Sequence, residues 1–233
     1  AFLAGNISQG ESWCGSYLVG DSAGYGAYQP WGDIWFDYKN LTADGVANYE
    51  RTLDLTTAIS NVSFTKDGTD YTREFFISHD DNVLVGRLEA EGTATLNFDV
   101  RFTSKQSGTT VAVSDNTLAL CGAVPDNQLK YASYIIVVPE DGTVKGATDR
   151  LTVENATAVT VYVSAATDYK NVFYNPDDAT DTYYYRTGES DEALAARVKA
   201  DVDSAVTKGY AEIKEDHISD YKELFDRVPL ELG

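Results

Sequence analysis

One histidine in a polar turn is the side chain of this sequence that is best placed for acid–base chemistry. His79 lies in the run Ser78-His79-Asp80-Asp81-Asn82, between two segments with strand character. A histidine that acts as a general base needs a nucleophile and an orienting group within hydrogen-bond reach, and no nucleophile motif surrounds this one. We therefore expect His79 to be a surface residue of a turn. The second of the two histidines, His217, follows the apolar side of a helical segment and is expected at an interface or in the core.

Carboxylates are the other abundant source of chemistry. A pair of them at a fixed separation could hydrolyse a glycosidic bond, but 37 acidic residues offer many pairs and the sequence gives no distances. No catalytic residue is therefore assigned. The segment 175–181 (NPDDATD) carries oxygen ligands of the kind that calcium prefers. It lacks the spacing and the terminal Glu of an EF-hand loop, so we expect a solvated loop.

A zinc site built from cysteine and histidine is effectively excluded, because the chain has two of each residue and no C-x-x-C motif. No metal and no cofactor are expected. Cys14 and Cys121 belong to different predicted elements, so a disulfide between them is possible. Two buried free thiols are the favoured alternative.

An aromatic group follows a Gly-rich stretch and is the candidate contact surface. It comprises Tyr25, Tyr28, Gln29 and Trp31. Aromatic rings stack on sugar rings, and Tyr and Trp are also common at protein interfaces. For Tyr28 and Trp31, contact with another domain and ordinary packing are equally favoured, and direct contact with a glycan is a smaller third option. Trp35 belongs to a strand pattern and is expected in the core.

Composition restricts the partners of this chain. The formal net charge is -19, from 37 acidic and 18 basic residues, which argues against nucleic acid and against anionic membranes as partners. No apolar run approaches the roughly 20 residues that span a bilayer. The sequence has no Met, even at position 1, so we expect that a segment before Ala1 has been removed. We also expect a secreted or cell-surface bacterial protein.

The residues that could do chemistry are carried by a long series of short strands. Thr-, Val- and Tyr-rich segments alternate with turns that contain Gly, Asn or Asp, which predicts antiparallel sheets packed as a sandwich. In one of these segments Leu96, Phe98, Val100 and Phe102 alternate with polar residues, as in a sheet with one solvated face. The predicted strands are 33–38, 47–55, 59–65, 71–78, 83–89, 93–103, 109–113, 117–121, 131–138, 143–145, 151–153 and 159–164.

Helical patterns stand at both ends of the series. A short helix is predicted over 4–18. Near the other end, Ser190 is a predicted N-cap and Gly209 is predicted to end the helix in the left-handed conformation; a second helix follows, and Pro229 stops it. The fold class is therefore mainly β, with a sandwich domain over 1–170 and a loop with a two-helix linker over 171–233. The apolar stripes are expected to dock on a body outside this chain, through Leu194, Val198, Val202, Ile213, Ile218, Tyr221 and Phe225.

Four stretches resemble glycoside hydrolase family 95, a family of α-L-fucosidases, the first three its amino-terminal domain and the last the segment that leads from its sandwich into its catalytic barrel. They are YGAYQPWGDIWFDY (25–38), YERTLDL (49–55), YTREFFISHDDNVLVGRLEA (71–90) and HISDYKELFDRVPLELG (217–233). The resemblance implies a large β-sandwich, a helical linker and an (α/α) barrel that holds the catalytic Glu and an Asn and Asp network. None of those catalytic residues can be placed on this chain. Family members also begin with further strands, so the sheet is expected to lack one or more edge strands, and open edges invite pairing.

The sequence therefore favours an accessory β-sandwich of an α-L-fucosidase, inactive by itself, that supports the catalytic barrel and its substrate cleft. Its expected partners are that barrel and a fucosylated oligosaccharide. The alternatives are an independent carbohydrate-binding module and a purely structural sandwich.

Overall fold

The described part of the chain contains two antiparallel sheets, two helices packed on the larger sheet and a short helical segment at the N-terminus. The structure is a computed structural model, and it describes residues 1–18, 30–39, 41–106, 108–170 and 185–228. Each of the twelve predicted strands is present in these ranges, with ends that shift by up to three residues. They are β1 (Asp33–Tyr38), β2 (Val46–Asp54), β3 (Ile59–Lys66), β4 (Thr69–Ser78), β5 (Val83–Ala90), β6 (Leu96–Thr103), β7 (Gly108–Ser114), β8 (Thr117–Ala123), β9 (Lys130–Glu140), β10 (Thr143–Ala147), β11 (Arg150–Ala156) and β12 (Ala158–Thr167).

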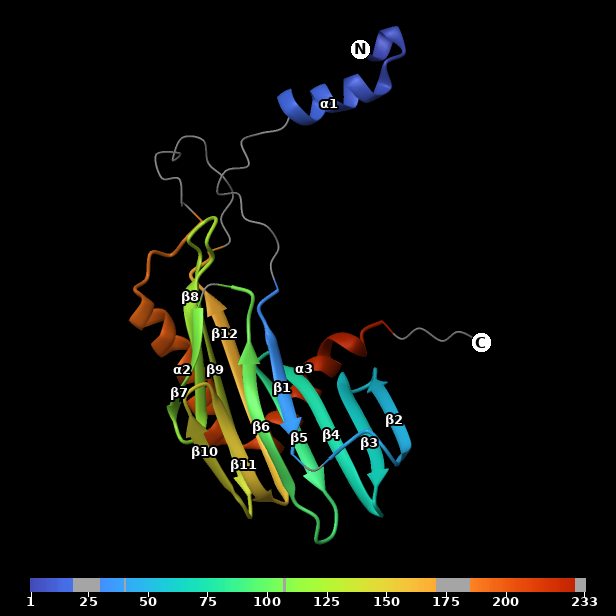
Figure 1. Cartoon of the computed structure of the whole chain (residues 1–233), viewed down its shortest axis with the longest axis vertical. Helices are drawn as coiled ribbons and strands as arrows, with labels where there is room; N and C mark the ends of the chain where they lie inside the picture. The colour runs from blue at the N-terminus through green and yellow to red at the C-terminus, as the bar shows by residue number, and fades with distance from the viewer. Residues whose placement is uncertain (19–29, 40, 107, 171–184, 229–233) are drawn as a thin grey trace.

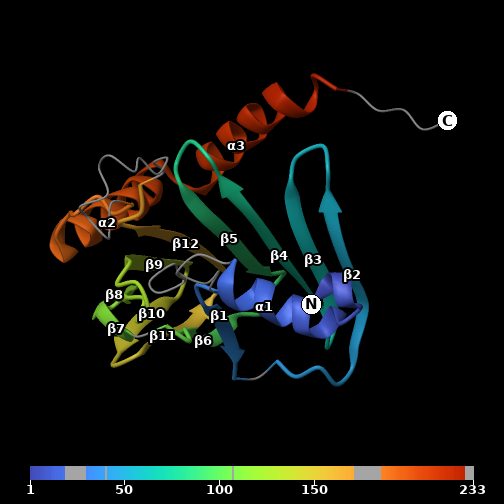
Figure 2. The same cartoon turned by 90° about the horizontal axis from the view of Figure 1, so that it is seen from above.

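The larger sheet has the order β2-β3-β4-β5-β12-β9-β8-β7, and the smaller has the order β1-β6-β11-β10. Neighbouring strands in both sheets run antiparallel. Figure 1 shows the smaller sheet lying across one half of the larger one, and Figure 2 shows β2, β3 and β4 continuing beyond it. The predicted fold class, a mainly β sandwich, is confirmed.

The main core lies between the two sheets. Strand β6 contributes Leu96, Phe98, Val100 and Phe102, all of them buried, as the alternation predicts. The prediction that Trp35 lies in the core is wrong, because this residue is 48% exposed. Its strand β1 lies at an edge of the smaller sheet and turns Phe36 inward against Phe98, so the residue before Phe36 faces outward.

Beyond β1, the inner face of the larger sheet is partly uncovered. Phe75 on β4 reaches β1 through Phe36, with ring centroids 6.4 Å apart. Ile77 stands two residues further along the same side of β4 and is 66% exposed, and Leu53 on β2 is 60% exposed. Among the described strands, β6 is the neighbour of β1, and no strand pairs with its other edge.

Helices α2 (Asp191–Lys208) and α3 (Tyr210–Phe225) cover the opposite face of the larger sheet, as Figure 2 shows. The side chain of Ser190 accepts a hydrogen bond from the backbone N–H of Ala193, which confirms the predicted N-cap. Gly209 separates the helices at φ 86°, ψ 158°. This conformation also suits glycine, but it is not the left-handed helical one that the sequence predicts. The predicted stop at Pro229 lies outside the described residues.

The stripe of α2 and α3 packs against the chain's own sheet. Leu194, Val198, Val202 and Ile213 are buried, with at most 1% of each residue exposed. Their neighbours include Val83, Val85, Phe76, Ile136 and Tyr162 on the outer face of the sheet. The expectation that these four side chains dock on a separate body is therefore wrong. The reason is that the larger sheet is apolar on both faces, so it supplies the partner that the stripe needs.

The N-terminal segment forms a short 3₁₀ helix, η1 (Phe2–Ala4), and the helix α1 (Ile7–Tyr17). Helix α1 lies within the predicted range 4–18, whereas η1 begins before it. In Figure 1, α1 lies beyond the end of the sandwich. Asn6 caps it by accepting a hydrogen bond from the N–H of Gln9. Both cysteines are free, but neither is buried as predicted, because Cys14 is partly exposed and Cys121 is exposed. No helix of the described residues has the length and apolarity that a bilayer-spanning helix requires.

Candidate functional site

A largely apolar groove runs between α3 and the ends of two hairpins. Its volume is about 580 Å³. One wall is α3, and the other walls are the end of the β2–β3 hairpin and the end of the β4–β5 hairpin. The lining residues are Ala58, Ser60, Phe75, Phe76, Ile77, His79, Leu84, His217, Asp220, Tyr221 and Leu224.

Two side chains of α3 hold the helix against the β2–β3 turn. The hydroxyl of Tyr221 donates to the backbone carbonyl of Leu55 at 2.8 Å. His217 Nε2 lies 2.9 Å from the carbonyl oxygen of Thr57. His217 is 6% exposed, and its ring stacks on that of Phe76 with centroids 4.8 Å apart. The expectation that His217 belongs to an interface or the core is confirmed, and its contact is with this chain's own hairpin.

The start of α3 is fixed by polar contacts with β4. The hydroxyl of Tyr210 donates to the carboxylate of Glu74, and Lys214 Nζ lies 2.6 Å from the same carboxylate. Burial and this hydrogen bond both raise the pKa of Tyr210 well above its usual range. The guanidinium of Arg87 lies over the Tyr210 ring, 5.1 Å from its centroid. These contacts fix the first turns of α3, and its later residues line the groove.

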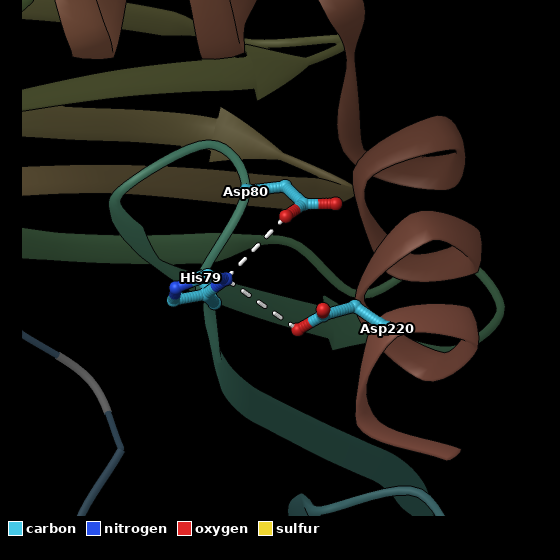
Figure 3. Close-up of side chains that lie close together, drawn as sticks. All are labelled: His79, Asp80 and Asp220. Atoms are coloured by element: carbon cyan, nitrogen blue, oxygen red, sulfur yellow. Dashed lines mark ion pairs between the residues drawn. The ribbon is translucent and has the colours of Figure 1, made fainter. Parts of the chain in front are cut away.

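A histidine and two carboxylates converge at the mouth of the groove. Figure 3 shows His79 in the β4–β5 turn with Asp80 beside it and Asp220 reaching across from α3. His79 Nδ1 lies 3.4 Å from Asp80 Oδ1 and 3.7 Å from Asp220 Oδ2. The His79 side chain is 85% exposed, so the expectation of a surface residue in a turn is confirmed. The sequence does not predict its partner on α3, which is 141 positions away.

The turn that carries His79 is braced by polar contacts of its own and of α2. The Ser78 hydroxyl donates to Asp81 Oδ2 at 2.7 Å, and Asn82 Nδ2 donates to Asp201 at 2.8 Å. Lys208 Nζ lies 2.8 Å from Asp81 Oδ1 and also pairs with Asp216. Hydrogen bonds to Asp216 and Asp81 raise the pKa of Lys208, so this cation stays charged across the physiological range. The backbone around His79 and Asp80 is therefore held in place from both sides.

The predicted aromatic group is only partly within the described residues, because Tyr25, Tyr28 and Gln29 lie outside them. Trp31 is partly buried, and its ring packs on Phe102 with centroids 4.6 Å apart. Its indole N–H donates to the hydroxyl of Ser133 on β9. For Trp31 the structure therefore supports ordinary packing over contact with another domain or with a glycan. The candidate calcium loop 175–181 also lies outside the described residues.

The remaining residues of the predicted docking face lie toward the free end of α3. Ile218 and Tyr221 are partly buried against the hairpins, whereas Phe225 is 42% exposed. Leu224 and Val228 beside it are 63% and 79% exposed. The apolar side of α3 thus continues past the edge of its own sheet, and its last turn remains open.

Comparison with known proteins places this fold in a family. The sequence matches the family described as "Glycosyl hydrolase family 65, N-terminal domain" over residues 1–172. Alpha-L-fucosidase 2 of Arabidopsis thaliana is 26% identical over 231 residues, which cover 88% of this chain and 26% of that protein. Probable alpha-fucosidase A of Aspergillus niger is 28% identical over 229 residues, 93% of this chain and 27% of that protein.

A solved structure agrees on the fold. A putative kojibiose phosphorylase from the human microbiome superposes with a TM-score of 0.59 at 10% sequence identity. The superposition covers 84% of this chain and 28% of that one. The chain spans less than a third of the length of each of these relatives. Because the matched residues 1–172 are well over half of the sequence, this chain belongs to the family of glycosyl hydrolase family 65 N-terminal domains.

Proposed function

We propose that this chain is the N-terminal β-sandwich of a longer α-L-fucosidase of the family 95 type, and that it supports the catalytic domain without performing catalysis itself. One observation carries the proposal: 88–93% of the chain aligns with proteins named as α-fucosidases, yet fills only 26–27% of their length. The alignments are longer than the 1–172 match of the sandwich family, so they extend into the helical segment as well.

Two surfaces support a role as one domain of a larger protein. Leu224 and Phe225 in the last turn of α3, and Val228 just after the helix, are exposed, whereas the earlier large apolar residues of α3 are buried or partly buried. The inner face of β2–β4 exposes Leu53 and Ile77 beyond the edge of the smaller sheet. Exposed apolar patches of this kind are typical of contact surfaces. We propose that the catalytic (α/α) barrel of the longer protein contacts one or both of them.

The experiment compares this chain with the longer protein that contains it. Both are purified and assayed for hydrolysis of a fucosylated disaccharide, with a galactosylated disaccharide as the control substrate. We expect fucose release by the longer protein and none by residues 1–233 alone. Turnover by the isolated chain would contradict the assignment of catalysis to another domain. Hydrolysis of the control substrate alone would contradict the α-L-fucosidase assignment.

The purified isolated chain is also used to test the alternative function, an independent carbohydrate-binding module. Titration calorimetry of the isolated chain with a fucosylated oligosaccharide is expected to give no heat above dilution. Among the described residues, the aromatic candidate Trp31 is packed on Phe102 and hydrogen-bonded to Ser133, which favours a supporting role over glycan binding. Saturable heat would favour the independent carbohydrate-binding module.

A further inference from the structure

We propose that His79, Asp80 and Asp220 bind a zinc ion that ties α3 to the β4–β5 turn. The three ligand atoms all lie within 4.8 Å of one another. Zinc commonly binds both imidazole nitrogen and carboxylate oxygen. Calcium binds oxygen ligands, so the imidazole nitrogen favours zinc over calcium. The low number of Cys and His excludes a site made of those residues, but it does not bear on a site made mostly of carboxylates.

The two distances from the imidazole to the carboxylates are close to those around a small tetrahedral ion. Zinc binds nitrogen and oxygen at about 2.0–2.1 Å, which puts tetrahedral ligand atoms about 3.3 Å apart. His79 Nδ1 lies 3.4 Å from Asp80 Oδ1 and 3.7 Å from Asp220 Oδ2. The two carboxylates lie within 4.8 Å of each other, so they must come closer together to complete a tetrahedral set. The side chains of His79 and Asp80 are 85% and 57% exposed, so packing does not hold them in place. Water would occupy the fourth position, because the site opens to solvent.

The charge of the cluster also favours a divalent cation. Two carboxylates face a single imidazole, so the group carries a charge of two minus when the imidazole is neutral. Neutral imidazole is the form that binds a metal ion. Among the described residues, the salt bridges of Asp80 and Asp220 are those with His79. The neighbouring cation Lys208 is instead paired with Asp81 and Asp216.

Both halves of the proposed site rest on braced backbone. Hydrogen bonds of Ser78, Asp81 and Asn82 fix the turn, and Asn82 and Asp81 are tied to α2. On α3, the contacts of His217 and Tyr221 with the β2–β3 turn flank Asp220. Ligands on supported elements lose little conformational freedom when they bind a metal. Bound zinc would therefore add a cross-link between residues far apart in the sequence and stabilise the folded state by mass action.

The experiment uses the purified chain after treatment with a chelator. Cobalt(II) serves as a spectroscopic probe of a tetrahedral site, and zinc is then added to displace it. We expect one equivalent of cobalt to give the visible absorption of tetrahedral cobalt, and zinc to abolish that absorption. Zinc should also raise the melting temperature of the chain.

Matched variants identify the ligands. His79→Ala and Asp220→Asn should each weaken zinc binding at least about tenfold. Glu223→Gln removes the same charge from an exposed position of α3 and should leave the affinity unchanged. Equal affinity of all three variants and the natural chain would overturn the proposal, as would the absence of one-to-one binding. The measurement needs no sugar substrate, so its outcome is independent of the proposed function.

Discussion

Tyr221 on α3 donates its hydroxyl to the backbone carbonyl of Leu55, 166 positions away, at 2.8 Å. This bond joins α3, the last helix among the described residues, to the turn that follows β2. His217, one helical turn earlier, contacts Thr57 in the same turn. Residues at i and i+4 share one side of a helix, so the two contacts work as a pair. Together they fix the direction in which α3 leaves the sandwich.

Tyr221→Phe removes this bond and keeps the ring. We expect the free energy of unfolding to fall by about 0.5–1.5 kcal/mol, the usual contribution of one hydrogen bond. Urea unfolding followed by circular dichroism measures it. Tyr49→Phe is the matched control, because Tyr49 is 62% exposed, and it should change stability by less than about 0.5 kcal/mol. Equal effects of the two variants would contradict the anchoring role of Tyr221.

Ile213→Ala examines the packing of α3 on its own sheet. Ile213 is 0% exposed and lies among the side chains between the helices and the larger sheet. Truncation of such a residue costs about 2–5 kcal/mol, because it loses apolar burial and leaves a cavity. Leu224→Ala, at a position that is 63% exposed, is the control and should cost less than about 0.5 kcal/mol. A small loss at Ile213 would mean that α3 does not dock on the sandwich in solution.

The strands of this fold can be predicted from the sequence because the period-2 pattern and the turn residues are local. Leu96, Phe98, Val100 and Phe102 mark β6 without knowledge of any other strand. The pairing is not local. Strand β5 pairs with β12 and β1 pairs with β6, and neither neighbour follows from residue order.

The partner of an apolar stripe is equally hidden from sequence reasoning. The pattern at Leu194, Val198 and Val202 fits a helix that docks on another domain and a helix that docks on its own sheet. The helix docks on its own sheet because Val83 and Val85 give the larger sheet a second apolar face. The His79–Asp220 pair has the same character, since a short polar turn contains no signal for a carboxylate on a distant helix.

Trp31→Phe separates packing from sugar contact. The variant keeps an aromatic ring against Phe102 but loses the indole donor to Ser133, which is 1% exposed. A buried hydroxyl without its partner costs about 1–3 kcal/mol, so a lower melting temperature is expected. Calorimetric heats with fucosylated oligosaccharide should be the same for both proteins. Unchanged stability together with altered heats would contradict the packing role.

Glu140→Gln examines a surface ion pair through its pH dependence. The hydrogen bond from Arg87 holds the pKa of the Glu140 carboxyl below its usual range. A lowered pKa in the folded state contributes stability above the unfolded pKa of about 4.3, and this contribution is lost as pH falls through the folded value. Glu140 is 54% exposed, so its contribution at pH 7 should stay below about 1 kcal/mol.

The variant should therefore be slightly less stable than the natural chain at neutral pH, and the difference should disappear in acid, where Glu140 is protonated in both the folded and the unfolded state. Urea unfolding at pH values on both sides of the carboxyl pKa measures the difference. Glu154→Gln, on β11 and exposed, is the control for removal of one charge from a chain of net charge -19. Lowering an excess of negative charge reduces self-repulsion, so this control should be neutral or slightly stabilising. A difference at Glu140 that persists in acid would mean that its carboxylate does not stabilise the fold through Arg87.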